Sequence, residues 1–439
     1  MSFASLSFIF YFIPGFFALY YVFGGRARMA VLLLGSLLFY AWGDVRALAL
    51  LLGLSLFTWL MGLGAAKSKA LMWAGIAVNI GTLCFFKYFE NPLGLPAGMS
   101  FYVFHAVSYL ADVRKRGRGT GPLCFAVYMT MFPKLLMGPI VSFDDFEEKY
   151  ALMKPDADKT ADGAFLFTVG LAKKALLAGP LSAFCSGLWQ DASSSPLSAW
   201  LALTAFGLQL YYDFNGYSDM ARGLGLMCGI DLGLNFDHPY ASASVSEFWR
   251  RWHMSLGAWF RKYLYFPLGG SRKGMARTLL NLMAVWLATG VWHGNTLNYL
   301  FWGLGLGVII CFEKLTRFSE RVPKLLGNLW QIFWIMLGWV FFNTADISEA
   351  LEYFRCLFTG MPLYVSASLS SAFHDSWGLL IISAFCASPL VYDCARELWG
   401  EGRGVFRIVL RNIIMVTLLV LSVIMLVNSG YSAFIYARF

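Results

Sequence analysis

The feature that most constrains the fold of this chain is a long series of apolar runs separated by short polar or charged joints. A membrane-spanning helix needs about 20 mostly apolar residues. The stretches that approach this length are 3–23, 29–43, 46–64, 70–87, 99–111, 123–141, 164–189, 198–214, 278–292, 296–312, 329–343, 377–394 and 405–428. Several are too short to cross alone, so some must pair, tilt or re-enter. Hydropathy therefore supports roughly ten to twelve crossings.

Composition excludes an ordinary soluble globule. Hydrophobic residues make up 59% of the 439 residues and charged residues only 13%, whereas a globular domain has roughly 25% charged residues. With so little polar surface, lipid must solvate much of the chain. We therefore predict an all-α, polytopic transmembrane protein built as one integral-membrane domain, residues 1–439, with interfacial and re-entrant helices around a central tunnel.

The charged residues indicate orientation rather than a nucleic-acid partner. A net charge of +9 is small and scattered, and the basic residues lie in short clusters between apolar runs, as in cytoplasmic loops. The clusters are Arg26 and Arg28, Lys67 and Lys69, Arg114–Arg118, and Lys173–Lys174. The first cluster follows the first span, which predicts an N-terminus outside the cytoplasm. The first span has no basic leader or cleavage site, so we expect a retained helix.

The eight cysteines predict neither disulfides nor a metal centre. They lie mostly inside apolar runs and without CxxC spacing. We interpret them as small buried hydrophobic residues, and we expect no metal site and no resident cofactor.

The most informative stretch is 246–294, which begins SEFWRRWHMSLGAWFRKYLYFPLGGSRKG and ends ATGVWHG. Arginines and lysines alternate there with tryptophans, a composition too cationic to cross lipid and too aromatic to remain in water. It is typical of helices that lie at or dip into the membrane interface. His253 lies in this basic aromatic setting, and His293 lies at the end of an apolar run.

An ionisable residue at an intramembrane position is a candidate functional residue. For His293, a buried ring bonded to a backbone carbonyl is an equally good interpretation of the residues alone. The other three histidines have simpler interpretations. His105 lies mid-run and suits packing or hydrogen bonding, His238 precedes a proline in a turn, and His374 lies in a polar segment.

The stretch QLYYDFNGYSDMARGLG, residues 209–225, places charged groups in apolar surroundings. Asn215-Gly216 predicts a helix break, with Asp213, Asp219 and Arg222 pairing across it. Such a break is tolerated where it is buried in protein or lines a cavity. We favour a structural bracket over catalysis here. Near residue 134, PKLLMGP predicts a kinked helix whose lysine extends to the interface.

Several of these motifs together resemble the membrane-bound O-acyltransferase family, in the branch that acetylates alginate and other exported polysaccharides. FWRRWHMSLGAWFRKYLYFPLGG followed by WHG carries the resemblance. SFYVFHAVSYLADV, FPKLLMGPIVSF, LQLYYDFNGYSDMARGLG, NFDHPY and the terminal FIYARF extend it in the family's order over most of the chain.

The resemblance implies an acetyltransferase of the bacterial inner membrane, with a catalytic core at about 100–312 and C-terminal helices at 329–439. Cytoplasmic acetyl-CoA would be the donor substrate and an exported polysaccharide the acceptor. An extracytoplasmic partner of the SGNH type would complete the transfer. Apart from this partner and the acceptor, the lipid bilayer is the expected surrounding, and no nucleic acid is involved.

The resemblance also assigns roles to residues. His293 occupies the position of the catalytic histidine, and an apolar wall favours the neutral ring that a base requires. His253 belongs to the signature as a supporting member of the catalytic site. Arg250, Arg251 and Trp252 are candidates for donor binding, because guanidinium groups suit the phosphates of coenzyme A. Trp252, like the other tryptophans of this stretch, is more typical of an interfacial anchor than of a ligand-binding residue. Asn215 and Asp219 are weaker candidates for substrate binding. The family's usual acid is absent at Lys262.

The terminal motif adds one further hypothesis. Tyr436 offers a hydroxyl that would accept the acyl group and pass it to the partner; an aromatic belt residue is the alternative.

Other functions remain open from the sequence. D-alanyl transfer toward teichoic acid would use a carrier-protein thioester in place of acetyl-CoA. A membrane transporter would use the two histidines to line a path, without covalent chemistry. A structural export subunit would need neither histidine.

Overall fold

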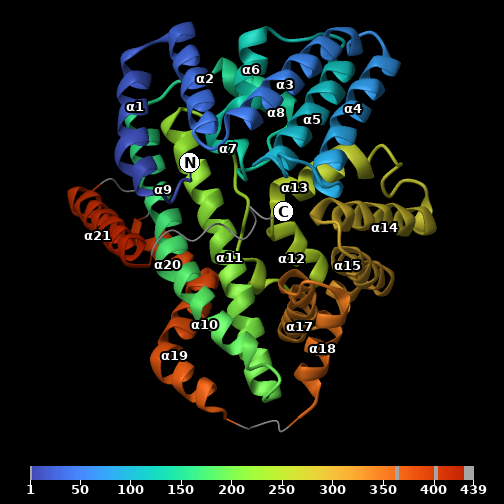
Figure 1. Ribbon diagram of the computed structural model, residues 1–439, viewed down its shortest axis with the longest axis vertical. Coiled ribbons are helices and arrows are strands. Elements are labelled where there is room, and N and C mark those ends of the chain that lie inside the picture. The colour runs from blue at the N-terminus through green and yellow to red at the C-terminus, as the bar shows by residue number, and fades with distance from the viewer. Residues whose placement is uncertain (1, 361–364, 400–403, 430–439) are drawn as a thin grey trace. The chain divides into compact units, whose positions relative to one another are not determined.

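The computed structural model describes residues 2–360, 365–399 and 404–429, and every regular element in these ranges is a helix (Figure 1). Seven of these helices are long and apolar enough to cross a membrane, and the shorter stretches Phe8–Val22 and Trp377–Ala387 are also apolar. The predicted all-α, multi-pass class is therefore confirmed. The count of ten to twelve crossings and the central tunnel stay predictions.

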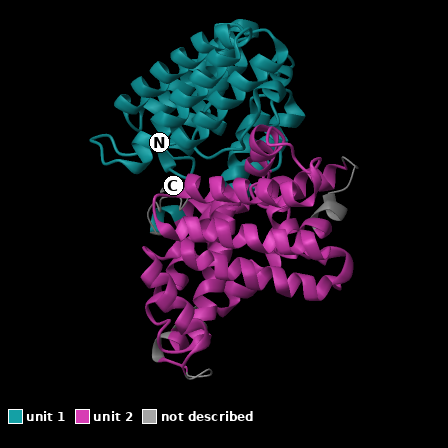
Figure 2. Cartoon of the chain, turned by 90° about the vertical axis from the view of Figure 1, so that its right-hand side faces the viewer, with its two compact units in different colours: residues 1–171, 217–234, 426–438 teal, residues 172–216, 235–425, 439 magenta. Residues whose placement is uncertain are grey.

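The chain folds into two compact units, each assembled from separate stretches of sequence (Figure 2). The first comprises residues 1–171, 217–234 and 426–438, and the second comprises residues 172–216, 235–425 and 439. The prediction of a single domain over 1–439 stays a prediction.

The helices that lie wholly or mainly in the first unit are η1 (Phe8–Phe12), α1 (Ile13–Val22), α2 (Gly25–Ala41), α3 (Val45–Ala65), α4 (Lys69–Tyr88), α5 (Met99–Arg116), α6 (Pro122–Thr130), α7 (Phe132–Leu135), α8 (Phe143–Ala151) and α9 (Ala157–Ala172). The last part of α11 (Pro196–Met227) also belongs to it.

The helices that lie wholly or mainly in the second unit are η2 (Lys173–Ala178), α10 (Gly179–Gln190), the first part of α11, η3 (Pro239–Ala241), α12 (Val245–Arg251), α13 (Met254–Phe260), η4 (Arg261–Tyr265), α14 (Gly274–His293), α15 (Leu297–Thr316), α16 (Phe318–Arg321), α17 (Lys324–Asn343), α18 (Ile347–Phe358), α19 (Ala367–Ala387), α20 (Pro389–Trp399) and α21 (Val405–Ser429).

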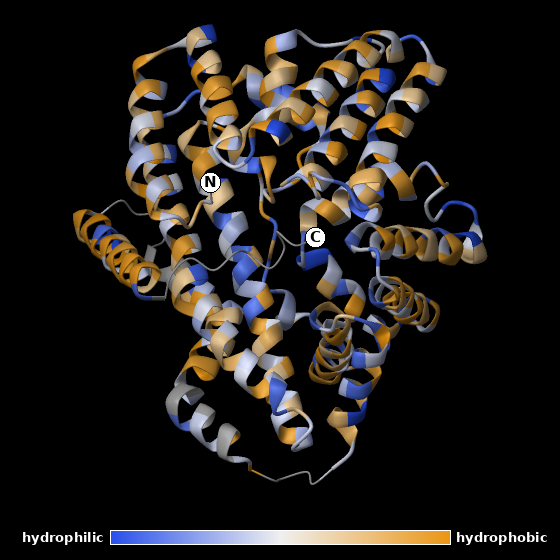
Figure 3. Ribbon diagram, viewed as in Figure 1, coloured by the Kyte–Doolittle hydropathy of each residue, from blue (hydrophilic) through white to orange (hydrophobic). Residues whose placement is uncertain are grey.

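Helix α3 illustrates how an apolar helix divides between protein and lipid. It begins at the N-cap Asp44, whose carboxylate accepts a hydrogen bond from the Arg46 backbone N–H. One face buries small and polar residues, and Thr58 is bonded to Asn79 of α4. The opposite face exposes leucines at 52, 56, 60 and 63. In water this stripe would be unfavourable, so lipid is its natural surrounding. Figure 3 shows that hydrophobic residues predominate along many of the helices.

Two sequence predictions about intramembrane charge are wrong. Lys134 does not extend to the interface: its side chain is fully buried, its ammonium donates to the carbonyl oxygen of Tyr128, and it lies 4.3 Å from the centre of the Tyr128 ring. A hydrogen bond and the π-face of the ring replace water there. The predicted break at Asn215-Gly216 is also absent, because α11 continues unbroken from Pro196 to Met227.

The charged groups near the predicted break pair with other partners. Lys173 and Lys174 are not in a loop but in the π-helical turn η2, and the Lys174 ammonium forms a buried ion pair with Asp213 of α11. Arg222 pairs with Asp231, a residue that follows the end of α11. The backbone hydrogen bonds of a helix are already satisfied, so only the charged side chains need partners. The buried Lys174–Asp213 pair and the partly exposed Arg222–Asp231 pair provide them.

We predict that replacing one member of the Lys174–Asp213 ion pair destabilises the protein more than replacing both. Asp213→Asn or Lys174→Met leaves one buried charge without its counter-charge and lowers the free energy of unfolding by about 3–5 kcal/mol, whereas Lys174→Met with Asp213→Leu recovers most of that loss. Thermal unfolding of the purified variants in detergent measures this. Equal destabilisation by the double and single variants would contradict it.

Candidate active site around two buried histidines

The central feature of the second unit is a helical hairpin, α14 and α15, with α17 packed against α15. Glycines permit the close approach of α14 to α15. A Cβ atom on Gly290 would lie 2.5 Å from the carbonyl oxygen of Tyr299, and one on Gly303 would lie 2.6 Å from that of Trp286. Any larger residue at these positions would separate the two helices.

Residues 243–270, which precede α14, meet the helices α14, α15 and α17 at one end and leave them at the same end. Ala243 packs closely on Gly327, near the start of α17, and the Asn281 amide near the start of α14 donates to the carbonyl oxygen of Gly270. Between these points, Trp249 packs against Trp286 and Trp302, with ring centroids 5.1 and 5.5 Å apart. The stretch 246–294 thus begins with the two short helices α12 and α13, and their re-entry into the membrane stays a prediction.

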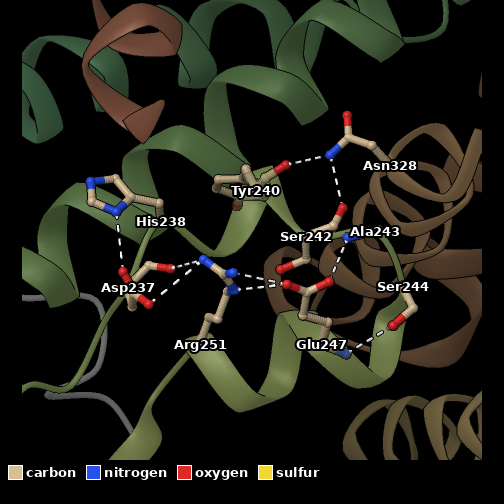
Figure 4. A network of polar contacts seen from close by, with 9 residues as sticks. All are labelled: Asp237, His238, Tyr240, Ser242, Ala243, Ser244, Glu247, Arg251 and Asn328. Carbon is tan, nitrogen blue, oxygen red and sulfur yellow. Dashed lines mark hydrogen bonds and ion pairs between the residues drawn. The ribbon is translucent and has the colours of Figure 1, made fainter. Parts of the chain in front are cut away.

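Local capping explains why α12 begins where it does (Figure 4). The Ser244 hydroxyl accepts from the Glu247 backbone N–H at 3.1 Å, while the Glu247 carboxylate accepts from the Ala243 backbone N–H at 2.9 Å. This arrangement is a capping box, here reaching one residue before the N-cap. Glu247 also pairs with Arg251 one turn later, at 2.9 Å.

The two arginines predicted to bind the donor differ in their surroundings. Arg251 is held between Glu247 and Asp237, and its guanidinium also donates to the Asp237 carbonyl oxygen (Figure 4). These contacts make Arg251 a structural link between α12 and the preceding loop at Asp237. Arg250 is exposed, so its guanidinium is accessible to an anion. Trp252 is almost fully buried and stacks on Phe248 at 5.4 Å, so it is not an interfacial anchor.

A carboxylate that the sequence analysis missed holds the N-terminus of α12. Glu313 of α15 is 4% exposed and accepts from the backbone N–H groups of Val245 and Ser246, at 2.7 and 2.8 Å. It also accepts from the Ser246 hydroxyl and from Trp330 Nε1. A negative charge at a helix N-terminus is favourable. A lone acid at the end of the apolar run 296–312 was the signal available.

We predict that Glu313 determines the placement of α12. Glu313→Ala leaves several buried donors without an acceptor and lowers the free energy of unfolding by about 2–4 kcal/mol, and Glu313→Gln recovers part of the loss because its amide oxygen still accepts. Thermal unfolding in detergent checks this order. Glu320→Ala, at an exposed acid on α16, is the matched control and should change little.

His253 occupies a strained turn between α12 and α13. Its φ of 46° lies in the left-handed region, which costs a residue with a side chain roughly 1–2 kcal/mol. Strain of this kind often marks a functional position. The ring is buried, lies edge-on to Phe214 with centroids 4.7 Å apart, and has Nδ1 3.3 Å from Asn235 Oδ1.

The contacts of Asn235 determine which ring nitrogen of His253 carries the proton. Oδ1 already accepts from the backbone N–H and the hydroxyl of Ser255, at 3.1 and 2.9 Å, so this atom is the amide oxygen. Nδ1 must therefore donate to it, and Nε2 is the basic nitrogen. Burial lowers the pKa of His253 to about 3. A buried ring with so low a pKa is neutral.

We predict that His253→Gly preserves the fold and impairs the reaction. Glycine adopts the left-handed turn without strain, which offsets the lost contacts, while acyl transfer falls by roughly tenfold to a hundredfold if the ring orients reacting groups. His238 has the same φ of 46°, so His238→Gly is the control for strain relief. Full activity in His253→Gly with normal thermal stability would show that the His253 side chain has no part in the reaction.

His293 is the last residue of α14 and is 2% exposed. Aromatic rings surround it: its centroid lies 4.6 Å from that of Trp292, 4.9 Å from Trp302 and 5.2 Å from Phe342. Trp302 and Phe342 come from α15 and α17, so three helices converge on this imidazole. The predicted apolar wall is present.

An aromatic cluster lies between the two histidines. Phe236 packs against Phe214 and Trp252, and Trp252 lies 5.0 Å from Trp339. Trp339 in turn packs against Trp249 and Phe342. A series of edge-on and tilted aromatic rings therefore connects His253 to His293.

Several buried polar atoms on the helices that form this site have no hydrogen-bond partner among the described residues. They are the indole nitrogens of Trp249, Trp252 and Trp302, and both amide atoms of Gln331, which is fully buried. An unsatisfied buried polar group costs about 1–3 kcal/mol. Water or a bound substrate normally meets such groups. Gln331 and Gly338 lie seven residues apart on α17 and thus on one face.

The remaining candidate residues are placed as follows. Asn215 is buried, and its amide oxygen lies 3.4 Å from the Lys173 ammonium of η2. Asp219 is buried in the first unit, so the structure does not assign it to this site. Tyr436 lies outside the described residues. Among the residues that the structure describes, no group of three or more histidines, cysteines or acids is arranged to hold a metal.

Fold and site together define a multi-pass helical membrane protein with two buried histidines near the short helices α12 and α13. A family model described as membrane-bound O-acyltransferase matches residues 98–345. The chain therefore belongs to the membrane-bound O-acyltransferase family, and the predicted family and acyltransferase class are confirmed.

Individual relatives refine this placement. The chain is 36% identical to the "Probable alginate O-acetylase AlgI" of Pseudomonas aeruginosa, over 82% of this chain and 75% of the relative. It is 32% identical to the peptidoglycan O-acetyltransferase of Helicobacter pylori, over 79% and 77%. The teichoic acid D-alanyltransferase of Bacillus subtilis is more distant, at 28% over 53% and 62%.

Proposed function

We propose that the protein transfers an acetyl group from cytoplasmic acetyl-CoA toward an exported polysaccharide, with His293 as the general base. The placement of His293 carries the proposal: a buried imidazole at the convergence of α14, α15 and α17, near buried donors that have no partner in the described part of the chain. The relatives named for alginate and peptidoglycan O-acetylation support acetyl and a cell-surface polymer.

Charge at the two ends of the hairpin supports access from both sides of the membrane. Arg272, Lys273 and Arg277 lie near the start of α14, and Lys314, Arg317, Arg321 and Lys324 lie near the end of α15 and the start of α17. The opposite ends, at residues 293–297 and 343–347, contain no lysine or arginine. The positive-inside rule therefore places the cationic ends in the cytoplasm and His293 toward the outside. For a bacterial protein this membrane is the inner one.

The chemistry requires one proton to move twice. His293 takes the proton of the acceptor hydroxyl while the hydroxyl oxygen attacks the carbonyl carbon of the thioester. When the tetrahedral intermediate collapses, the carbon–sulfur bond breaks and the imidazolium protonates the thiolate, which leaves as coenzyme A. The new ester carries the acetyl group outward. An SGNH-type partner outside the cytoplasm would complete transfer to the sugar, and a Tyr436 relay remains a hypothesis within this scheme.

Trp302 is suited to stabilise the negative charge that forms on the carbonyl oxygen. Its ring lies 4.9 Å from His293, and its buried Nε1 has no acceptor among the described residues. It faces Gly338: a Cβ atom built there would lie 3.4 Å from Nε1 and would meet only this indole within 4 Å among the described atoms. The missing side chain thus leaves space in front of a preorganised donor.

Donor binding on the cytoplasmic side would use the exposed guanidinium of Arg250. Arg251 would act indirectly, by holding α12 to the Asp237 loop. Asn235 and Glu313, which support His253 and α12, would complete the positioning of the site.

D-alanyl transfer from a carrier-protein thioester is the second candidate, supported by the more distant D-alanyltransferase relative. Labelled acetyl-CoA and a labelled D-alanyl carrier protein, offered separately to the purified protein with its acceptor, distinguish the two. Family membership disfavours a transporter or a purely structural subunit.

We predict that His293→Ala abolishes acyl transfer while the protein accumulates normally in the membrane, because no other group at this position can take the proton. Transfer of label from acetyl-CoA in membranes measures activity, and immunoblotting measures accumulation. His374→Ala, at an exposed histidine, is the control. Retained transfer in His293→Ala would exclude this base.

We predict that Trp302→Phe lowers kcat by roughly 10²–10³ with little change in KM, since it removes one donor to the developing oxyanion and keeps the ring. Gly338→Ala should act in the same direction by occupying the space before Nε1. Trp286→Phe is the control, because Trp286 packs on Trp302 with centroids 5.9 Å apart. Equal losses in Trp302→Phe and Trp286→Phe would indicate a packing role only.

A further inference from the structure

A cavity of about 710 Å³ lies in the second unit, on a part of α17 separate from the His293 site. Its walls come from α11, η3, α17 and the junction of α19 with α20. The lining residues are Thr204, Leu208, Tyr240, Ala241, Lys324, Leu325, Asn328, Ile332, Met336, Ala384, Ala387 and Ser388. The volume lies within the range of small-molecule sites, roughly 300–1,000 Å³.

The cavity changes from polar to apolar along α17. Lys324, Asn328, Ile332 and Met336 line it and follow one another at intervals of four, so they form one ridge along the helix. With a rise of 1.5 Å per residue, the ridge is about 18 Å long. An ammonium therefore marks one end and an aliphatic and a thioether side chain mark the other.

This gradient matches the shape and chemistry of a phospholipid. Apolar side chains of Leu208, Ile332 and Met336 suit an acyl chain, and the Lys324 ammonium, exposed at the first turn of α17, suits a phosphate. The N-terminal backbone N–H groups of α17 add a favourable field for an anion. No carboxylate is among the described residues that line the cavity.

The surroundings also favour an anionic headgroup. Arg317 and Arg321 are exposed in the short segment before α17, so a second negative charge would meet further cations. Membrane helices normally begin at headgroup depth, which is where Lys324 stands at the start of a candidate span.

We propose that this cavity binds an anionic phospholipid, with one acyl chain along Asn328–Met336 and the phosphate at Lys324. The site would also stabilise the candidate active site. Tyr240 and Asn328 line the cavity, and the Asn328 amide donates to the carbonyl oxygens of Tyr240 and Ser242, at 2.7 and 3.0 Å, directly before α12 (Figure 4). Lipid in the cavity would hold this loop in place.

Native mass spectrometry of the full-length protein in detergent tests the proposal. The protein is titrated with phosphatidylglycerol, with phosphatidylcholine of the same chains, and with inorganic phosphate. We expect retained phosphatidylglycerol to exceed phosphatidylcholine by about fivefold, because the choline cation of phosphatidylcholine offsets its phosphate charge and is repelled by the cationic end at Lys324. Inorganic phosphate should not bind, because it lacks the acyl chain.

Two pairs of variants assign the binding to this cavity. Lys324→Gln should abolish the headgroup preference, whereas Lys314→Gln, at an exposed lysine of the same cationic end that does not line the cavity, should preserve it. Ala387→Phe should fill the cavity and reduce retention of both lipids severalfold, whereas Ala387→Ser should retain them.

Specific results would overturn the proposal. These are equal retention of the two lipids by the unmodified protein, equal effects of Lys324→Gln and Lys314→Gln, or undiminished retention in a well-folded Ala387→Phe. Since Lys324 is exposed, its variant tests the site even if Ala387→Phe does not fold. None of these measurements depends on acyl transfer.

Discussion

The constraint on which this structure depends is that lipid offers no water to polar groups, so the protein must satisfy them itself. The pairs Lys174–Asp213 and Thr58–Asn79 do so between helices, and Lys134 does so with a carbonyl oxygen and an aromatic face. Each arrangement replaces hydration by a specific partner. The helices can therefore carry charge without leaving the apolar phase.

The candidate active site departs from this rule in an informative way. Glu313 fully engages the N-terminus of α12, and Asn235 engages the ring of His253. Yet the indole of Trp302 and the amide of Gln331 are buried without partners among the described residues. Such unsatisfied groups, together with the left-handed turn at His253, are features that functional sites often carry.

The class of protein was predictable from the sequence. Runs of about 20 apolar residues with few charges identify membrane helices, because lipid leaves few other solutions. The basic aromatic segment predicted a re-entrant helix, and the motifs around His253 and His293 predicted the family. Glu313 and Trp302 were not found, since one acid and one tryptophan among many carry no local signal about their partners.

The sequence by itself determined an all-helical membrane protein of this family, whereas the segment that dips into the membrane and the chemical role of the two histidines stay predictions. Only the tertiary structure decided that α11 is unbroken at Asn215-Gly216, that Arg251 braces the loop at Asp237, and that Glu313 holds α12. The length and periodicity of an apolar run are local properties that can be read directly from the order of residues. The partner of a buried charge is chosen by which helices pack together, often across more than 60 residues of chain, as Glu313 and Val245 show with a separation of 68.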